Sequence, residues 1–294
     1  MKTTSMKHVF MVAVAAIATA SFCSAEVLLN DTFADGSRGE TDLPNESAVW
    51  VGTPGSVTMG AGSLAYGQGT SSQKLWTYFA SEGSPVSLVV GEKLVATIQF
   101  SPEGAFNNST SRNFRFGLFN DPTDGQLLSD TNSDNGGDGR WTDSTGYAVM
   151  FSLSSATAST IQVGKRIDQT NSSLLGSTGV YSWGTGAGGA SNLSLDTVYT
   201  MTLALDYQAA DLMKVDFTFA DGNGWSTTAS LSDNGLGGDP LWTNFDQLFF
   251  RFSSSTGTAN VVDFHSIAIE HIVPEPATML LLGLGGLVSL RKRH

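Results

Sequence analysis

Short runs of apolar and β-branched residues alternate along the middle of the chain with segments rich in Gly, Asn, Asp and Ser. The alternation is strict in residues 113–119, where Phe114, Phe116 and Leu118 share one face of a strand and Arg115 lies on the other. No window before residue 277 shows a sustained helical period. The pattern therefore predicts an all-β body, folded as a two-sheet sandwich, with strands at 93–100, 113–119, 147–153, 160–167, 198–207, 213–219, 247–252 and 260–269.

The first 25 residues have the pattern of a secretory signal peptide. Lys2 and Lys7 form a positive start, residues 9–20 are apolar, and small residues at 23–25 precede Glu26. This apolar run is shorter than the roughly 20 residues that a transmembrane helix needs. We therefore expect cleavage after residue 25 and export of the remainder.

The last 22 residues form a second distinct segment, at 273–294. Its Pro274-Glu275-Pro276 motif is followed by an apolar run at 277–290 and by the cations Arg291, Lys292 and Arg293. As a helix, the apolar run would be about 21 Å long, shorter than a membrane core of about 30 Å. This predicts a short transmembrane helix with its cations on the cytoplasmic side, suited to a transient span.

These residues resemble the PEP-CTERM protein-sorting signal: Pro-Glu-Pro, then a glycine-containing apolar run, then a basic end. The resemblance implies a Gram-negative bacterium that makes extracellular polysaccharide. It also implies recognition by exosortase, a transpeptidase-like membrane enzyme, with passage through the inner membrane, removal of the tail and delivery to the cell surface or matrix. It implies nothing about the activity of the body, predicted at residues 26–272.

Charge and cysteine content narrow the functions of that body. The chain has 27 acidic and 15 basic residues, a net charge of −12, and five of its bases lie in the two terminal segments. Such a body is not expected to bind nucleic acid. Cys23 is the only cysteine and leaves with the signal peptide, so the mature chain has no disulfide and depends on a packed core.

A second resemblance concerns the body itself. The segment 114–120, the Gly146-Tyr147 pair and the closing strand at 262–269 look like parts of a concanavalin/laminin-G-type jelly roll. The resemblance implies a fold that also hosts glycosidases, so a glycoside hydrolase is an alternative to a structural or adhesive role. The usual nucleophile and phosphate-loop motifs are missing, and Pro44 interrupts the acidic segment 40–46, so we expect a protein that is not an enzyme.

Two kinds of candidate binding residue remain. Residues 130–139 place oxygen-bearing side chains at alternate positions among glycines. This pattern is typical of a calcium-binding loop, but an ordinary solvated loop has it as well. The candidate ligands are Asp130, Asn132, Asp134 and Asp138, with Asp121 and Asp124 nearby and a weaker second loop at 233–239.

Trp141, Trp183 and Trp242 lie in or beside polar loops, where they either stack on a sugar or cover the core. The sequence thus favours an exported surface or matrix protein that contacts polysaccharide. A calcium-dependent carbohydrate-binding module is the first alternative, and a glycoside hydrolase is the second.

Overall fold

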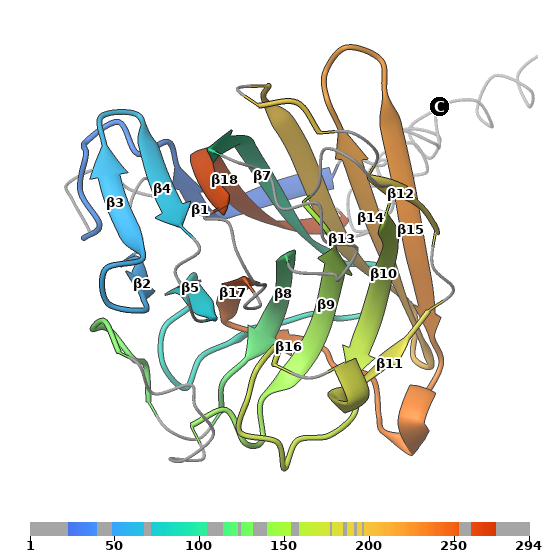
Figure 1. Ribbon diagram of the computed structural model, residues 1–294. Coiled ribbons are helices and arrows are strands. Elements are labelled where there is room, and N and C mark those ends of the chain that lie inside the picture. Colours follow the sequence, from blue (N-terminus) through green and yellow to red (C-terminus); the bar gives the residue numbers. More distant parts are fainter. Residues whose placement is uncertain are drawn as a thin grey trace, which may run out of the picture. The chain divides into compact units, whose positions relative to one another are not determined.

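The computed structural model is built almost entirely of β-strands, which form two large sheets and one short ribbon (Figure 1). It describes residues 23–39, 49–67, 72–104, 114–122, 125–131, 140–153, 159–176, 178–184, 187–190, 193–195, 197–252 and 260–274. Over these residues, helical structure is limited to two 3-10 turns, η1 (Thr178–Val180) and η2 (Leu236–Gly238). The prediction of an all-β, two-sheet sandwich is confirmed, and every run predicted as a strand overlaps an observed one.

Sheet A contains eight of the strands, and its central strands alternate between buried and solvent-facing positions. Strand β13 follows this alternation over most of its length, as expected for a sheet with one face on the core. The order across the sheet is β15 (Ser226–Asp233), β14 (Leu212–Ala220), β13 (Tyr199–Ala209), β7 (Lys93–Gly104), β18 (Asn260–Pro274), β4 (Ser63–Gly67) and β3 (Val57–Gly60), with β1 (Cys23–Asp31) also pairing with β18.

Sheet B also contains eight strands. The order is β11 (Tyr181–Trp183), β10 (Ser159–Arg166), β9 (Thr145–Phe151), β8 (Phe114–Asn120), β17 (Gln247–Phe252), β5 (Gln73–Tyr78) and β2 (Val51–Gly52), with β12 (Ala187–Ala190) pairing with β10. The short ribbon pairs β6 (Val86–Ser87) with β16 (Asn244–Phe245). Strand β16 of this ribbon directly precedes β17 in the chain and so fixes the entry into sheet B.

Aromatic side chains fill the space between the two sheets. Phe114 of β8 is fully buried, and its ring centroid lies 5.0 Å from that of Phe252 and 5.4 Å from that of Phe151. It also faces Phe100 of sheet A at 6.4 Å. The alternation seen in residues 113–119 therefore does place Phe114, Phe116 and Leu118 in one core, as predicted.

The opposite face of sheet B is buried as well, under a second, smaller cluster. Here Trp76 stacks on Phe249 with ring centroids 5.7 Å apart, and Trp141 packs edge-on against Phe249 at 5.2 Å. Arg115, on this face, donates hydrogen bonds to the carbonyls of Leu175 and Gly176, at 2.7 and 2.9 Å. The segment around residue 175 is thereby held over the cluster, which explains why several strands of sheet B are apolar on both faces.

Strand β18 is longer than predicted. It continues past residue 269 to Pro274, the start of the Pro-Glu-Pro motif. Near its end, His271 Nε2 lies 3.0 Å from Glu92 Oε2. The chain separates into one compact unit at Val27–His271 and a second at Met1–Glu26 with Ile272–His294, of which the structure describes residues 23–26 and 272–274.

Candidate functional site

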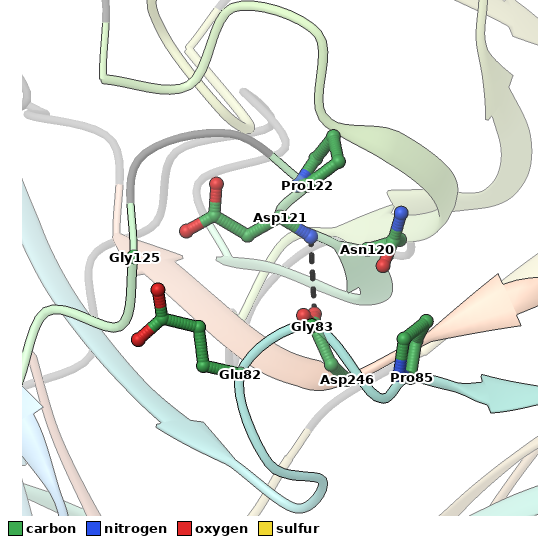
Figure 2. A pocket seen from close by; sticks show the side chains of 8 residues that line it. All are labelled: Glu82, Gly83, Pro85, Asn120, Asp121, Pro122, Gly125 and Asp246. Carbon is green, nitrogen blue, oxygen red and sulfur yellow. Dashed lines mark hydrogen bonds between the residues drawn. The ribbon is translucent and has the colours of Figure 1, made fainter.

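An acidic pocket of about 270 Å³ opens beside the end of β8. Figure 2 shows the side chains around it, which come from the loop between β5 and β6, from the end of β8 and the loop after it, and from the junction of β16 with β17. Its lining consists of Glu82, Gly83, Pro85, Asn120, Asp121, Pro122, Gly125 and Asp246. Carboxylate and amide oxygens dominate this set, so the pocket favours a cationic or hydrogen-bonding ligand over an apolar one.

Asp246 is the most deeply placed acid of the pocket, with 3% of its surface exposed. Its Oδ1 accepts a hydrogen bond from the Asp121 backbone N–H at 3.0 Å (Figure 2). Its own backbone is fixed on both sides, because its N–H donates to Phe119 O and its carbonyl accepts from Phe79 N–H. Burial raises the pKa of Asp246 to about 7, and the neighbouring Asp121 carboxylate acts in the same direction.

Asp121 is held in a different way from Asp246. Its Oδ2 accepts hydrogen bonds from Tyr78 Oη at 2.9 Å and from an Arg140 guanidinium nitrogen at 3.0 Å. Arg140 also donates to the carbonyl of Gly125. Burial, assisted by the Asp121 charge, raises the pKa of Tyr78, so that its phenol stays protonated as a donor. The charge of Asp121 is therefore compensated by Arg140, whereas burial favours the neutral form of Asp246.

Glu82 is the solvent-facing acid of the pocket. It approaches Gly125, at which an added Cβ would lie 3.1 Å from Glu82 Oε1. Gly125 has a φ of +71°, a left-handed conformation that suits glycine. A side chain at position 125 would therefore both strain the loop and narrow the pocket.

The predicted calcium loop is described only at its two ends. Asp130 forms a bidentate ion pair with Arg38, in which Oδ2 lies 2.9 Å from Nη1, and its Oδ1 accepts from Gly52 N–H at 3.0 Å. The Arg38 guanidinium, through its hydrogen bonds, holds the pKa of Asp130 below its usual value. Arg140 anchors the other end through Asp121. Asn132, Asp134, Asp138 and Asp124 lie outside the described residues.

The oxygen atoms of Asp130 are thus already engaged in an ion pair and a backbone hydrogen bond. In the weaker candidate loop at 233–239, Asp233 is also engaged in an ion pair, with Lys165, and unlike Asp130 it is fully buried. Within the described part of the chain, no three or more His, Cys, Asp or Glu side chains are grouped so as to hold a metal ion. The acidic segment 40–46 is not among the described residues.

The three tryptophans proposed for sugar stacking differ in their surroundings. Trp141 is 1% exposed and lies in the smaller core, which is the alternative that the sequence left open. Trp183 is partly buried, packs on Tyr181 at 4.9 Å and donates from Nε1 to Thr178 O. Trp242 is partly buried against the main core and donates from Nε1 to Arg166 O at 2.9 Å. The polar ends of Trp183 and Trp242 are therefore already bonded within the protein.

The sorting motif begins where the described structure ends. Pro274 is exposed and is the last residue of β18. Glu275, Pro276, Arg291, Lys292 and Arg293 lie beyond it, outside the described residues, as does the predicted membrane helix. Among the residues that the structure does describe, no helix is long and apolar enough to cross a membrane.

Comparison with known proteins identifies the C-terminal segment. Residues 273–293 match the PEP-CTERM protein-sorting motif, which confirms that resemblance. No curated protein sequence matches the chain.

Among solved structures, the chain is similar to a peanut lectin bound to a 9-residue peptide, at 13% identity, 86% coverage of this chain, 99% of the lectin and a TM-score of 0.49. It is similar to lectin I of Ulex europaeus with a methyl fucoside, at 10% identity, 85% and 98% coverage and a TM-score of 0.49. It is also similar to the VIP36 lumenal domain in a Ca²⁺/mannose-bound form, at 11% identity, 83% and 91% coverage and a TM-score of 0.47. At these identities the similarity concerns the fold alone.

Proposed function

We propose that this chain is an exported protein of the bacterial surface or extracellular matrix, sorted through its C-terminal segment and acting there as a structural or adhesive component. The match of residues 273–293 to the protein-sorting motif carries this proposal. The motif calls for an exosortase as the processing partner and for a passage through the inner membrane in a Gram-negative cell. After export, the body would then be in contact with extracellular polysaccharide.

We propose that the body has a binding or structural role and no enzymatic activity. A glycoside hydrolase needs two carboxylates that both reach the substrate across one sugar bond. In the acidic pocket, Asp121 is tied to Arg140 and Tyr78, and Asp246 accepts a hydrogen bond from the Asp121 backbone N–H. This arrangement supports a protein without enzymatic activity.

Replacement of the acid in the sorting motif tests the proposed function. Glu275→Gln keeps the size of the side chain but removes its charge, and we expect the tail to be retained and the protein to stay with the inner membrane. Wild type should lose residues 1–25 and the tail and reach the surface fraction. Intact mass and cell fractionation report both steps, in strains with and without the exosortase.

The matched control is Glu270→Gln, which removes an acid at a partly buried position of β18, before the motif. It should be processed as wild type is. Equal processing of Glu275→Gln and wild type, or a full-length tail in wild-type cells, would overturn the sorting proposal and leave a simple tail-anchored protein.

A second candidate function is calcium-dependent carbohydrate binding at the acidic pocket, and Asp246 is the observation that favours it. Asp246 is a buried carboxyl group in the pocket lining, with Asn120 and Glu82 as further oxygen donors. A divalent cation there would stabilise its ionised form, and oxygen donors are the ligands calcium prefers. The pocket adjoins the segment 125–131, which leads into the predicted calcium loop.

Calcium addition at pH 8 is therefore expected to raise the melting temperature by about 5 °C or more at saturation, because a ligand that binds only the folded state stabilises it. The rise should be absent in Asp246→Asn and preserved in Asp211→Asn, which removes an exposed acid far along the chain. Differential scanning calorimetry with and without a chelator measures it. An unchanged wild-type melting temperature would remove calcium from consideration.

A further inference from the structure

Lys165 and Asp233 form an ion pair in the interior, between the two sheets. Lys165 belongs to β10 of sheet B, and Asp233 is the last residue of β15 in sheet A. Both side chains are 0% exposed. Lys165 Nζ lies 3.1 Å from Asp233 Oδ2 and 3.3 Å from Oδ1, so the nitrogen faces both oxygens of the carboxyl group.

Each oxygen of Asp233 has its own hydrogen-bond donors. Oδ1 accepts from the backbone N–H groups of Gly235 and Leu236, at 3.0 and 2.9 Å. Oδ2 accepts from the Tyr147 hydroxyl at 2.7 Å. The two oxygens are thus chemically distinct: two fixed amides face one, and a proton donor faces the other.

The side chain of Lys165 is also held by specific contacts. Its Nζ donates to Asp239 O at 3.0 Å and lies 5.2 Å from the centre of the Trp242 ring. Both side chains are shielded from water, and transfer of one proton from Nζ to the carboxylate would turn the ion pair into an amine beside a carboxylic acid. A neutral amine beside a carboxylic acid is a nucleophile beside an acyl group.

The surroundings of this pair match the requirements of acyl transfer. The nitrogen lies 3.1 and 3.3 Å from the two oxygens of the carboxyl group, so the two reacting groups are already held together. Two backbone N–H groups face the oxygen that becomes negative in a tetrahedral intermediate, as in an oxyanion hole. Tyr147 supplies a proton donor at the other oxygen, with its hydroxyl 2.7 Å from Oδ2.

We propose that Lys165 and Asp233 condense into an amide, which joins the two sheets by a covalent bond. One ammonium proton passes to Oδ2, and the Nζ–Cγ bond forms while Oδ1 takes the negative charge. The Cγ–Oδ2 bond then breaks, and Oδ2 leaves as water after taking the hydroxyl proton of Tyr147. A second proton from Nζ then passes to the Tyr147 oxygen and restores its hydroxyl. An ammonium and a carboxylate thus become one amide and one water, and no oxidant or cofactor takes part.

The amide would link residues 68 positions apart in sequence. Without Cys23, no cysteine remains in the mature chain, so this amide would be a covalent brace where a disulfide cannot form. It would also fix the loop after β15, whose amides bind Asp233. Its formation is independent of the sorting motif and of any ligand in the acidic pocket.

Mass spectrometry of the purified full-length wild-type chain under denaturing conditions tests this proposal. We expect a mass lower by one water than the sequence between the observed termini requires. A tryptic digest should contain a branched peptide that joins Lys165 to Asp233, with no cleavage after Lys165. A mass equal to that of the sequence, with both peptides found separately, would show that the pair is only an ion pair.

Two comparisons sharpen this test. Lys214 and Asp216 also form an ion pair, at 2.8 Å, but both are about 40% exposed, so the same digest should show normal cleavage after Lys214. Lys165→Arg cannot form the amide and should have the full mass of its sequence.

Tyr147→Phe removes only the hydroxyl that acts as proton donor and should slow amide formation by about a hundredfold, seen as uncrosslinked chain in freshly made protein. A rate equal to that of wild type would overturn the part assigned to Tyr147.

Discussion

Replacement of Phe114 by alanine is expected to lower the free energy of unfolding by about 4 kcal/mol, the usual range for emptying a buried aromatic site. Phe114 packs against rings of both sheets in the main core, with contacts to Phe100 of one sheet and to Phe151 and Phe252 of the other. All these neighbours lie on rigid strands, so the cavity cannot collapse at low cost. Urea denaturation followed by tryptophan fluorescence measures the loss.

A graded pair of variants makes this result interpretable. Phe114→Leu keeps most of the volume and should lose less than about 1.5 kcal/mol. Val90→Ala, at a side chain that is 52% exposed, should change the stability by no more than about 0.5 kcal/mol. A loss below 1 kcal/mol for Phe114→Ala would mean that the aromatic cluster is not the centre of the fold.

Asp246→Asn is expected to stabilise the protein above pH 7, by up to about 4 kcal/mol, because a shift of about three pKa units corresponds to that energy. The folded pKa of Asp246 is about 7, well above the ordinary value of about 4 in an unfolded chain. The folded state therefore binds the proton more tightly between these values. The stability that Asp246 contributes is full below about pH 4 and is lost as the pH rises through 7.

Asparagine at this position keeps the oxygen that accepts from Asp121 N–H but cannot ionise. The free energy of unfolding should therefore fall between pH 5 and pH 8 in wild type by more than it does in Asp246→Asn. Asp211→Asn serves as the control for a change of one exposed charge. Parallel pH profiles for wild type and Asp246→Asn would show that the carboxyl group is not buried as described.

Local sequence pattern was sufficient for the strands of the main core. Alternation in residues 113–119 placed Phe114 inward and Arg115 outward, and the structure confirms both. The pattern did not predict that Phe119 would also be buried. Phe119 is covered by Trp141 and the segment around Leu175, which come from distant parts of the chain. For the same reason the sequence could not decide whether Trp141 was exposed or buried.

The candidate site was only partly visible in the sequence. Asp121 was recognised as a neighbour of an oxygen-rich loop, since both lie in one polar segment. Asp246 gave no such signal: it is a single acid between two apolar runs, and its burial depends on contact with the end of β8, 125 residues away. Asp130 showed the opposite case, since a local pattern suggested a metal ligand while its partner Arg38 lies 92 residues away.

The position of β18 has a mechanical consequence. It lies between β7 and β4 in the interior of sheet A, and it is the strand that continues into the C-terminal segment. A force applied through that end would act along the strand, whereas its ladder hydrogen bonds run across it. The hydrogen bonds along β18 would then be loaded together in shear rather than opened one at a time. A body held to an envelope by this end is thus attached at a place where it resists being pulled apart.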